Sequence, residues 1–462
     1  MEHVHFVGIG GTGLSAIARY LHEKGLQVSG SDRQRSTLGD ELARTGVRIY
    51  IGHQADQIDG ADVVVRSSAV PDDNPEIQAA LGAGIPVLKR SEFLPRMLAD
   101  EAVIAVAGTH GKTTTTAMIA WTLKALGEDP SYIIGSIALN LGANAHAGQG
   151  RNFVIEADEY DHMFLGLHPQ VAVITTIEHD HPDFFPTPES FFAAFEQFVA
   201  TIRPEGYLVV CRDDPGVLRL LEASWQTRLM VRTYSLETGA DFSARELQPL
   251  EGRGYSFKLY RQDEYQAEVS LQVPGRHNVY NALAAMAVIE VLGLPLSRAA
   301  GALSAFKGTA RRFELLGEPH GIAIIDDYAH HPTEIRATLQ AARRRYPGRR
   351  IWVVWQPHTY SRVRRLIFDF SHAFDQADRV IVTDIYAARE TPPVDGFSSV
   401  DVVNVIQHPA VQLIPDIHDA AETLTAELAP GDVLLVLSAG DADQISRWVL
   451  AALEAPEKET HG

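Results

Sequence analysis

The chain of 462 residues carries 59 acidic and 40 basic side chains, for a formal net charge of −19 at pH 7. This acidic excess argues against nucleic acid as a general partner, because a phosphate backbone requires a basic surface. The length corresponds to about three domains of ordinary size. No apolar run approaches the ~20 residues needed to cross a bilayer, and the single cysteine, Cys211, excludes an intramolecular disulfide framework. We therefore expect a cytoplasmic protein with no membrane span.

Residues 1–98 alternate predicted strands and helices. The first residues are predicted to form a strand, His3 to Val7, rather than a signal peptide. A glycine turn reading GIGGTG follows, and Asp32 comes after the second predicted strand, Leu26 to Ser29. Further strands are predicted at 47–51, 63–65 and 86–88. This GxGxxG pattern with a later acid is typical of dinucleotide binding, but glycine turns follow the first strand of many doubly wound folds. The pattern requires only a phosphate over the turn and a ribose near the acid.

The stretch Val103 to Ala120, reading VIAVAGTHGKTTTTAMIA, predicts an ATP site. An apolar run breaks at Gly108, and helical spacing begins at Lys112. A strand, a glycine turn and a helix start aim backbone N–H groups and a helix dipole at a phosphate. Lys112 is placed to reach the outer phosphates, and the hydroxyl of Thr113 or Thr114 can hold magnesium.

Two later strands of the same unit, residues 99–309, end in carboxylates. The strand beginning at Phe153 runs into EADEYD, and Val171 to Ile177 runs into EHDHPD. At the carboxyl edge of a parallel sheet these oxygens suit magnesium, and a histidine nitrogen can complete a second site. The alternative is a solvated acidic loop, and His179 is predicted to be an ordinary surface residue. Further on, Asn278 can cap an alanine-rich helix, with Asn281 on the same face.

The last unit, residues 310–462, contains four predicted strands that end in polar loops. The strands are Ile322 to Ile325, Ile351 to Trp355, Arg379 to Val382 and Val433 to Leu437. The loops after them begin DDYAHHPTE, QPHTYSR, DIYAARE and SAGD. Because the carboxyl ends of parallel strands meet at one edge, these loops predict a second part of the site.

The shortened phosphate loop resembles that of the Mur ligases and the folylpolyglutamate synthases. The remaining motifs are similar to the Mur ligases along nearly the whole chain. In chain order they are VGIGGTGLSAIA, VVRSSAV with NPEI, GTHGKTTTT, EADEYD, IEHDHPD, PGRHNVYNA, RRFE, DDYAHHPTE and QPHTYSR. The resemblance implies a three-domain α/β protein: an N-terminal Rossmann-like parallel sheet (1–98), a central P-loop ATPase-type domain (99–309) and a C-terminal Rossmann-like domain (310–462).

The resemblance also implies the residues that bind each substrate. The UDP-sugar would contact Gly8, Gly10, Gly11, Thr12, Gly13, Asp32, Ser67, Ser68 and Arg90. ATP would contact Gly108, Thr109, His110, Gly111, Lys112, Thr113, Thr114, His277, Asn278, Asn281, Arg312 and Asp327. Magnesium would be held by Thr113, Glu156 and His181, and the amino acid by Tyr328, His330, His358 and Arg362. Lys112, Glu156, His181 and Arg312 would be the catalytic set.

Within the family the motifs are most similar to the branch that joins L-alanine to UDP-N-acetylmuramate. The implied reaction uses ATP and Mg²⁺ and passes through an acyl phosphate, as an early step of peptidoglycan synthesis. The third domain would close over the second, and the protein would act as a monomer or weak homodimer. Two positions depart from the family pattern: Phe184 to Arg203 contains no lysine that could form a bridging carbamate, and Thr359 stands where some relatives carry an arginine.

Three alternatives remain open at this stage. A related ligase could attach a preformed tripeptide to UDP-N-acetylmuramate in cell-wall recycling. An NAD-dependent dehydrogenase would use the first glycine turn and Asp32, but it leaves GTHGKTTTT and the acid clusters without a role. A non-catalytic nucleotide switch would leave the polar loops of the third unit without a role.

Overall fold

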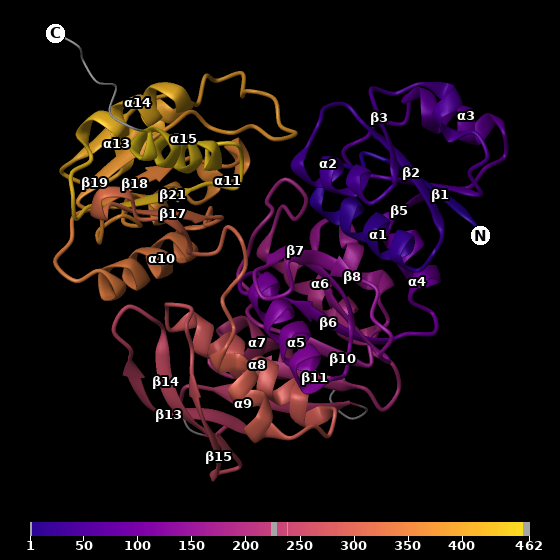
Figure 1. Cartoon of the computed structure of the whole chain (residues 1–462), viewed down its shortest axis with the longest axis horizontal. Helices are drawn as coiled ribbons and strands as arrows, with labels where there is room; N and C mark the ends of the chain where they lie inside the picture. The colour runs from indigo at the N-terminus through magenta and orange to yellow at the C-terminus, as the bar shows by residue number, and fades with distance from the viewer. Residues whose placement is uncertain (1, 223–228, 238, 456–462) are drawn as a thin grey trace.

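The computed structural model describes residues 2–222, 229–237 and 239–455, which form three sheets flanked by helices (Figure 1). The first sheet lies in the N-terminal part of the chain, the second in the middle and the third in the C-terminal part. The predicted three-domain α/β fold is therefore confirmed. Among the described residues, no helix is long and apolar enough to cross a bilayer.

The N-terminal sheet has the order β3-β2-β1-β4-β5, and all its pairings are parallel. Its strands are β1 (His3–Val7), β2 (Gln27–Asp32), β3 (Arg48–Ile51), β4 (Val63–Arg66) and β5 (Val87–Lys89). Its helices are α1 (Thr12–Glu23), α2 (Thr37–Arg44), α3 (Pro75–Gly82) and α4 (Arg90–Met97), with the short helix η1 (Ala55–Ile58). All five residues of β1 are buried, as expected for a central parallel strand covered by helices on both faces.

The middle sheet has ten strands in the order β15-β14-β13-β12-β11-β10-β6-β9-β7-β8. They are β6 (Ala102–Ala107), β7 (Ser131–Ala138), β8 (Ala143–His146), β9 (Asn152–Glu156), β10 (Val171–Ile174), β11 (Tyr207–Cys211), β12 (Met230–Ser235), β13 (Phe242–Pro249), β14 (Tyr255–Arg261) and β15 (Glu264–Ser270). The helices are α5 (Lys112–Leu126), η2 (Tyr160–Gly166), α6 (Pro188–Ala200), α7 (Pro215–Glu222), α8 (His277–Val291) and α9 (Leu296–Ser304). Strands β13 to β15 form an antiparallel meander at one edge.

The C-terminal sheet has the order β16-β17-β21-β18-β19-β20 and is parallel except for β16. Its strands are β16 (Glu314–Gly317), β17 (Ala323–Asp327), β18 (Ile351–Trp355), β19 (Arg379–Val382), β20 (Val411–Leu413) and β21 (Val433–Leu437). Its helices are η4 (Pro319–Gly321), α10 (Pro332–Arg345), α11 (Tyr360–Arg365), α12 (Ile367–Ser371), α13 (Ser399–Val405), α14 (Ile417–Glu427) and α15 (Asp443–Glu454). The four predicted parallel strands adjoin in this sheet, so their polar loops share one edge.

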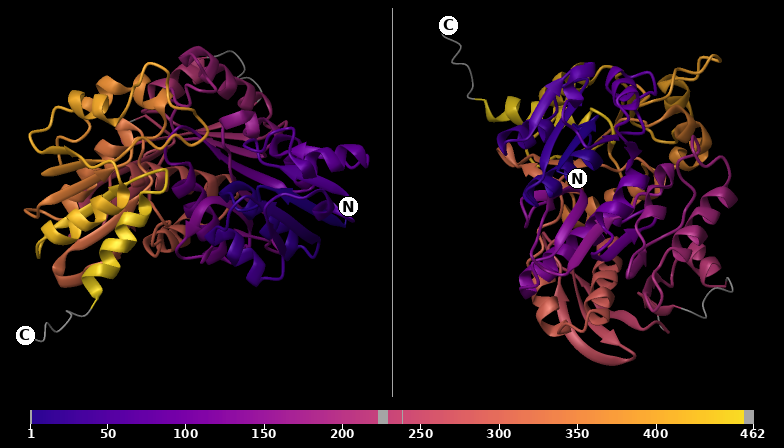
Figure 2. Two further views of the ribbon diagram at one scale, coloured as in Figure 1. Left: turned by 90° about the horizontal axis from the view of Figure 1, so that it is seen from above. Right: turned by 90° about the vertical axis from the view of Figure 1, so that its right-hand side faces the viewer.

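The first and third domains lie on opposite sides of the molecule, and both contact the middle domain (Figures 1 and 2). The loops after β6 and β10 face the third domain, because side chains from these loops bond to residues that follow β17 and β18. The predicted site residues therefore lie where the domains meet.

Candidate active site

The phosphate loop joins β6 to α5. Gly108 and Gly111 have positive φ angles of 128° and 83°, which residues with side chains rarely adopt. A Cβ atom at Gly108 would lie 2.1 Å from Thr175 Oγ1, so the loop packs directly on the end of β10. Helix α5 begins at Lys112, and its first backbone N–H groups face the loop. The strand, turn and helix thus follow each other as the motif predicts.

Lys112 lies against a buried carboxylate. Its Nζ atom donates to Gly108 O at 2.6 Å and to Glu159 Oε1 at 3.0 Å. Burial opposes the charge, but Glu159, Asp158 and Glu156 together raise the pKa of Lys112. The lysine is therefore a fixed positive charge at neutral pH, held at the loop where phosphate oxygens would bind.

The predicted magnesium ligands come from three elements. Glu156, the last residue of β9, accepts a hydrogen bond from Thr113 Oγ1 at 3.0 Å and from the Gly135 N–H at 2.7 Å. His181 Nε2 lies 3.5 Å from Glu159 Oε1, so Glu159 connects His181 to Lys112. Thr113 and Glu156 supply hydroxyl and carboxylate oxygens, which are the ligands that Mg²⁺ prefers, and His181 adds an imidazole nitrogen. The structure brings Thr113 and Glu156 into direct contact.

A cavity of about 330 Å³ lies between the middle and third domains beside the phosphate loop. Nine of the predicted ATP-binding residues line it: His110, Gly111, Thr113, Thr114, His277, Asn278, Asn281, Arg312 and Asp327. The other three, Gly108, Thr109 and Lys112, belong to the adjoining loop. The cavity is also lined by Tyr234, Tyr280 and Phe313, aromatic side chains that were not selected from the sequence.

The predicted cap of α8 is wrong. The helix begins at His277 with no side-chain cap, and Asn278 lies inside it. Asn278 Nδ2 donates to Pro274 O at 2.6 Å, and its Oδ1 accepts from Asn281 Nδ2 at 3.0 Å. Asn281 Oδ1 in turn accepts from Thr115 Oγ1 at 3.1 Å. The two asparagines therefore join α8 to α5 at the wall of the cavity, while burial lowers the pKa of His277 to about 4 and keeps it neutral.

Arg312 and Asp327 enter the cavity from the third domain. Asp327 accepts the N–H groups of Phe313 and Ala329, each at 2.7 Å, and so fixes the turn that carries Arg312. The Arg312 guanidinium lies 3.8 Å from Glu334 Oε1. Burial raises the pKa of Asp327 to about 6.

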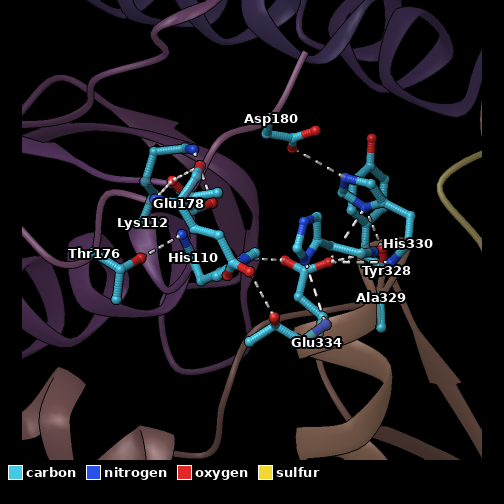
Figure 3. A network of polar contacts seen from close by, with 12 residues as sticks. His110, Lys112, Thr176, Glu178, Asp180, Tyr328, Ala329, His330 and Glu334 are labelled. Carbon is cyan, nitrogen blue, oxygen red and sulfur yellow. Dashed lines mark hydrogen bonds and ion pairs between the residues drawn. The ribbon is translucent and has the colours of Figure 1, made fainter. Parts of the chain in front are cut away.

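His110 of the phosphate loop contacts both domains (Figure 3). Its Nε2 lies 2.9 Å from Glu178 Oε2, and its Nδ1 lies 3.1 Å from Glu334 Oε1 of the third domain. Thr333 Oγ1 also donates to Glu178 Oε1 at 3.0 Å. Burial opposes protonation of the imidazole, but Glu178 and Glu334 raise the pKa of His110 to about 9. A protonated histidine between two carboxylates therefore joins the phosphate loop to the third domain.

The predicted amino-acid residues converge around Asp180. Arg362 Nε donates to Asp180 Oδ1 at 2.7 Å, and both side chains are almost fully buried. Arg362 Nη1 lies 2.9 Å from His358 Nδ1, and the rings of His330 and His358 lie 5.9 Å apart. The His330 ring packs edge-on against Tyr328, with ring centres 5.4 Å apart, and faces Asp180 (Figure 3).

The predicted UDP-sugar residues all follow the carboxyl ends of strands in the first sheet. They follow β1 (Gly8, Gly10, Gly11, Thr12, Gly13), end β2 (Asp32) and follow β4 (Ser67, Ser68) and β5 (Arg90). The Gly10 N–H donates to Asp32 Oδ2 at 2.9 Å. Arg90 packs on the turn, since a Cβ atom at Gly13 would lie 2.3 Å from its Nη1. Arg90 Nη2 also lies 3.3 Å from Asp158 Oδ2, which places this edge beside the middle domain.

Several residues in these contacts were not singled out from the sequence. Glu159, Asp180, Glu178 and Glu334 each bond to a predicted site residue. The motifs that contain these four residues were identified, but the residues themselves were not selected because their bonding partners lie far away in the chain. The expectation for His179 is wrong, because this residue is partly buried and its Nε2 lies 2.8 Å from Phe185 O.

Comparison with known proteins gives matches along the chain. Residues 3–102 match the Mur ligase family catalytic domain, 106–289 the Mur ligase middle domain and 311–440 the Mur ligase glutamate ligase domain. A UDP-N-acetylmuramate–L-alanine ligase of Rubrobacter xylanophilus is 46% identical over 455 residues, covering 97% of this chain and 100% of the relative. The chain belongs to the Mur ligase family.

Solved Mur ligase structures have the same fold. The UDP-N-acetylmuramate–alanine ligase of Thermotoga maritima superposes with a TM-score of 0.82 at 29% identity, covering 97% of this chain and 98% of that one. A murein peptide ligase of Psychrobacter arcticus superposes with a TM-score of 0.74 at 27% identity, covering 99% and 100%. Both likenesses extend over all three domains of this Mur ligase.

Proposed function

We propose that this Mur ligase uses ATP to join L-alanine to the lactyl carboxylate of UDP-N-acetylmuramate, releasing ADP and phosphate. We infer the two substrates from the names of the relatives that this chain resembles along its whole length. The observation that carries the chemistry is a continuous set of contacts from Lys112 through Glu159 and His181 to Arg362. These contacts connect the phosphate loop with the predicted amino-acid residues.

The site fits the triphosphate and the metal ion. The cavity of about 330 Å³ adjoins the phosphate loop and is also lined by Arg312 and Asp327 of the third domain. Thr113, Glu156 and His181 would hold Mg²⁺, which supplies charge neutralisation at the transferring phosphoryl group. Lys112 would contact the outer phosphates from the start of α5. The aromatic residues of the cavity would surround the adenine.

In the first step, the lactyl carboxylate attacks the γ-phosphorus of ATP, and ADP leaves. Lys112 and Arg312 approach this centre from two domains and stabilise the negative charge on the phosphoryl oxygens. Closure of the third domain by the His110 and Asp180 contacts excludes water that would hydrolyse the acyl phosphate.

In the second step, the amine of L-alanine attacks the acyl carbon and phosphate leaves. Burial lowers the pKa of His330 to about 4 and that of His358 to about 2, so both imidazoles are neutral at pH 7. Neutral rings do not repel the ammonium form of the incoming amino acid. We place this reaction in the cytoplasm, where ATP is supplied, with the protein acting as a monomer or weak homodimer.

The test is ADP release from ATP, Mg²⁺ and UDP-N-acetylmuramate, with and without L-alanine. We expect strong stimulation by L-alanine and a loss of at least about 100-fold in Lys112→Ala, because a phosphate-binding charge is removed. Lys124→Ala is the matched control, since Lys124 is an exposed lysine near the other end of the same helix. Stimulation by the tripeptide alone would assign the protein to the murein peptide ligases, and no dependence on the nucleotide sugar would contradict the proposal.

A further inference from the structure

The one arginine predicted to bind the amino acid is already engaged by the protein. Arg362 Nε donates to Asp180 Oδ1, and its Nη1 donates to His358 O at 2.9 Å and lies equally close to His358 Nδ1. Its Nη2 lies 3.4 Å from His181 Nδ1. Only 4% of the side chain is exposed. Arg362 therefore orients the residues around it, and its charge is neutralised by Asp180, so the α-carboxylate of an amino acid needs another cation.

Arg389 lies beside the same group of residues. Its guanidinium carbon is 3.8 Å from the centre of the Tyr160 ring, and that ring is 5.2 Å from the ring of His181. Its Nε lies 3.4 Å from Asp183 Oδ2, and 49% of the side chain is exposed. Within residues 2–222, 229–237 and 239–455, neither terminal nitrogen of Arg389 donates a hydrogen bond, and its ion pair with Asp183 is made through Nε. The two terminal nitrogens of Arg389 can therefore donate to a ligand, while its Nε lies against Asp183.

The loop that carries Arg389 is fixed next to the amino-acid residues. The neighbouring Glu390 accepts hydrogen bonds from Thr359 Oγ1 at 2.7 Å and from the Ser361 N–H at 3.0 Å. Both donors lie on the segment between His358 and Arg362. Glu390 therefore uses its oxygens to hold the two loops together and does not neutralise Arg389.

An open cavity of about 700 Å³ adjoins this junction, and three arginines and one glutamate are among the residues that line it. Arg364, Arg365 and Arg389 line it together with Pro182, which directly follows His181. Arg364 is paired with Asp395 at 2.8 Å, so its charge is offset. Arg389 is the arginine of this cavity that also contacts the carboxylate-rich loop of the middle domain.

We propose that Arg389 binds the α-carboxylate of the incoming amino acid through its two terminal nitrogens, at the inner end of this cavity. This assignment rests on the proposed function, and it names the residue that binds the α-carboxylate of L-alanine in that reaction. A planar guanidinium matches a carboxylate with two parallel hydrogen bonds. The stack on Tyr160 and the Asp183 contact would hold the plane in place.

The test measures ADP release at saturating ATP and UDP-N-acetylmuramate while L-alanine is varied. We expect Arg389→Ala to raise KM for L-alanine by roughly 10- to 100-fold, the range for a lost charge-assisted contact. KM for ATP and for the nucleotide sugar should stay within about twofold, and Arg389→Lys should recover part of the loss because it keeps the charge without the fork. Arg245→Ala is the matched control, since Arg245 also stacks on a tyrosine (Tyr260, 4.3 Å) and pairs with an aspartate, Asp263, at an edge of the middle sheet.

L-Alaninamide separates a binding role from a structural one, because it carries the same amine and methyl group without the carboxylate. We expect the wild type to prefer L-alanine, and Arg389→Ala to lose most of that preference. An unchanged KM for L-alanine in Arg389→Ala, or an equal rise in KM for L-alanine and L-alaninamide, would overturn the assignment. If the wild type itself shows no L-alanine-dependent ADP release, the proposed function fails and the assignment fails with it.

Discussion

The ion pair between Asp180 and Arg362 joins the middle domain to the third domain, and its removal is the sharpest test of how the site is closed. The two side chains are 6% and 4% exposed, with Nε and Oδ1 2.7 Å apart. Arg362 holds the pKa of Asp180 well below its usual range despite the opposing effect of burial. Asp180→Asn keeps the shape of the side chain and removes its charge, which leaves a buried guanidinium without a counter-ion.

The Asp180→Asn substitution destabilises the closed arrangement of the domains. Removing one partner of a buried ion pair costs about 3–5 kcal/mol, and asparagine still offers one oxygen to Arg362, so we take the lower figure. Because opening the domains returns Arg362 to water, the penalty of about 3 kcal/mol lowers the ratio of closed to open molecules by roughly 100-fold. We expect kcat to fall by a similar factor, since catalysis requires closure.

The assay is fluorescence energy transfer between dyes on Lys124→Cys in the middle domain and Glu427→Cys in the third, both exposed positions. Burial raises the pKa of Cys211 to about 12, so the native thiol does not compete for labelling. Asp432→Asn is the control, because Asp432 pairs with Arg350 inside the third domain at 2.6 Å. Equal closure and equal kcat in Asp180→Asn and Asp432→Asn would refute this reasoning.

Two further predictions concern other parts of the site. The pKa of His110 is about 9 in the folded protein against 6.5 for the free group, so its contribution, on the order of 3 kcal/mol, is fully present below pH 6.5 and is lost as pH rises through 9. The difference in melting temperature between the wild type and His110→Gln should therefore shrink between pH 6 and 9.5, and a constant difference would contradict the assignment of the charge. In Gly10→Ala, the new Cβ would lie 2.6 Å from Ser36 Oγ and 2.9 Å from Asp32 Oδ2. We expect KM for UDP-N-acetylmuramate to rise about tenfold, the equivalent of ~1.4 kcal/mol, with KM for ATP unchanged in the same steady-state assay.

Elements defined by local pattern were predicted well. The apolar run ending at Ala107, the glycine turn and the helix from Lys112 are confirmed as β6 and α5, because a buried parallel strand and a phosphate turn both have strong local signals. The meander β13–β15 was missed, although residues 255–261 show the alternating burial of a half-exposed strand. The cap of α8 was misassigned because Asn278 lies inside the helix and donates to Pro274 O instead, a contact that the local pattern does not reveal.

The site itself could be predicted only as separate groups of residues. Lys112 was selected because it begins the helix after the glycine turn, whereas Glu156 and His181 were selected individually through the resemblance of their strand-end motifs to the Mur ligases. The residues that connect the groups were not selected, since their partners are far away in the chain: Asp180 and Arg362 are separated by 182 positions. Such pairings depend on how the third domain packs on the second, which no local pattern encodes.

The most direct measurement of the central claim follows the oxygen atoms of the substrate. UDP-N-acetylmuramate labelled with ¹⁸O in its lactyl carboxylate is incubated with ATP, Mg²⁺ and L-alanine, and the released phosphate is analysed by mass spectrometry. An acyl phosphate passes one carboxylate oxygen to the phosphate, so the account predicts one labelled oxygen in each phosphate formed with the ligated product. Unlabelled phosphate released together with that product would contradict it.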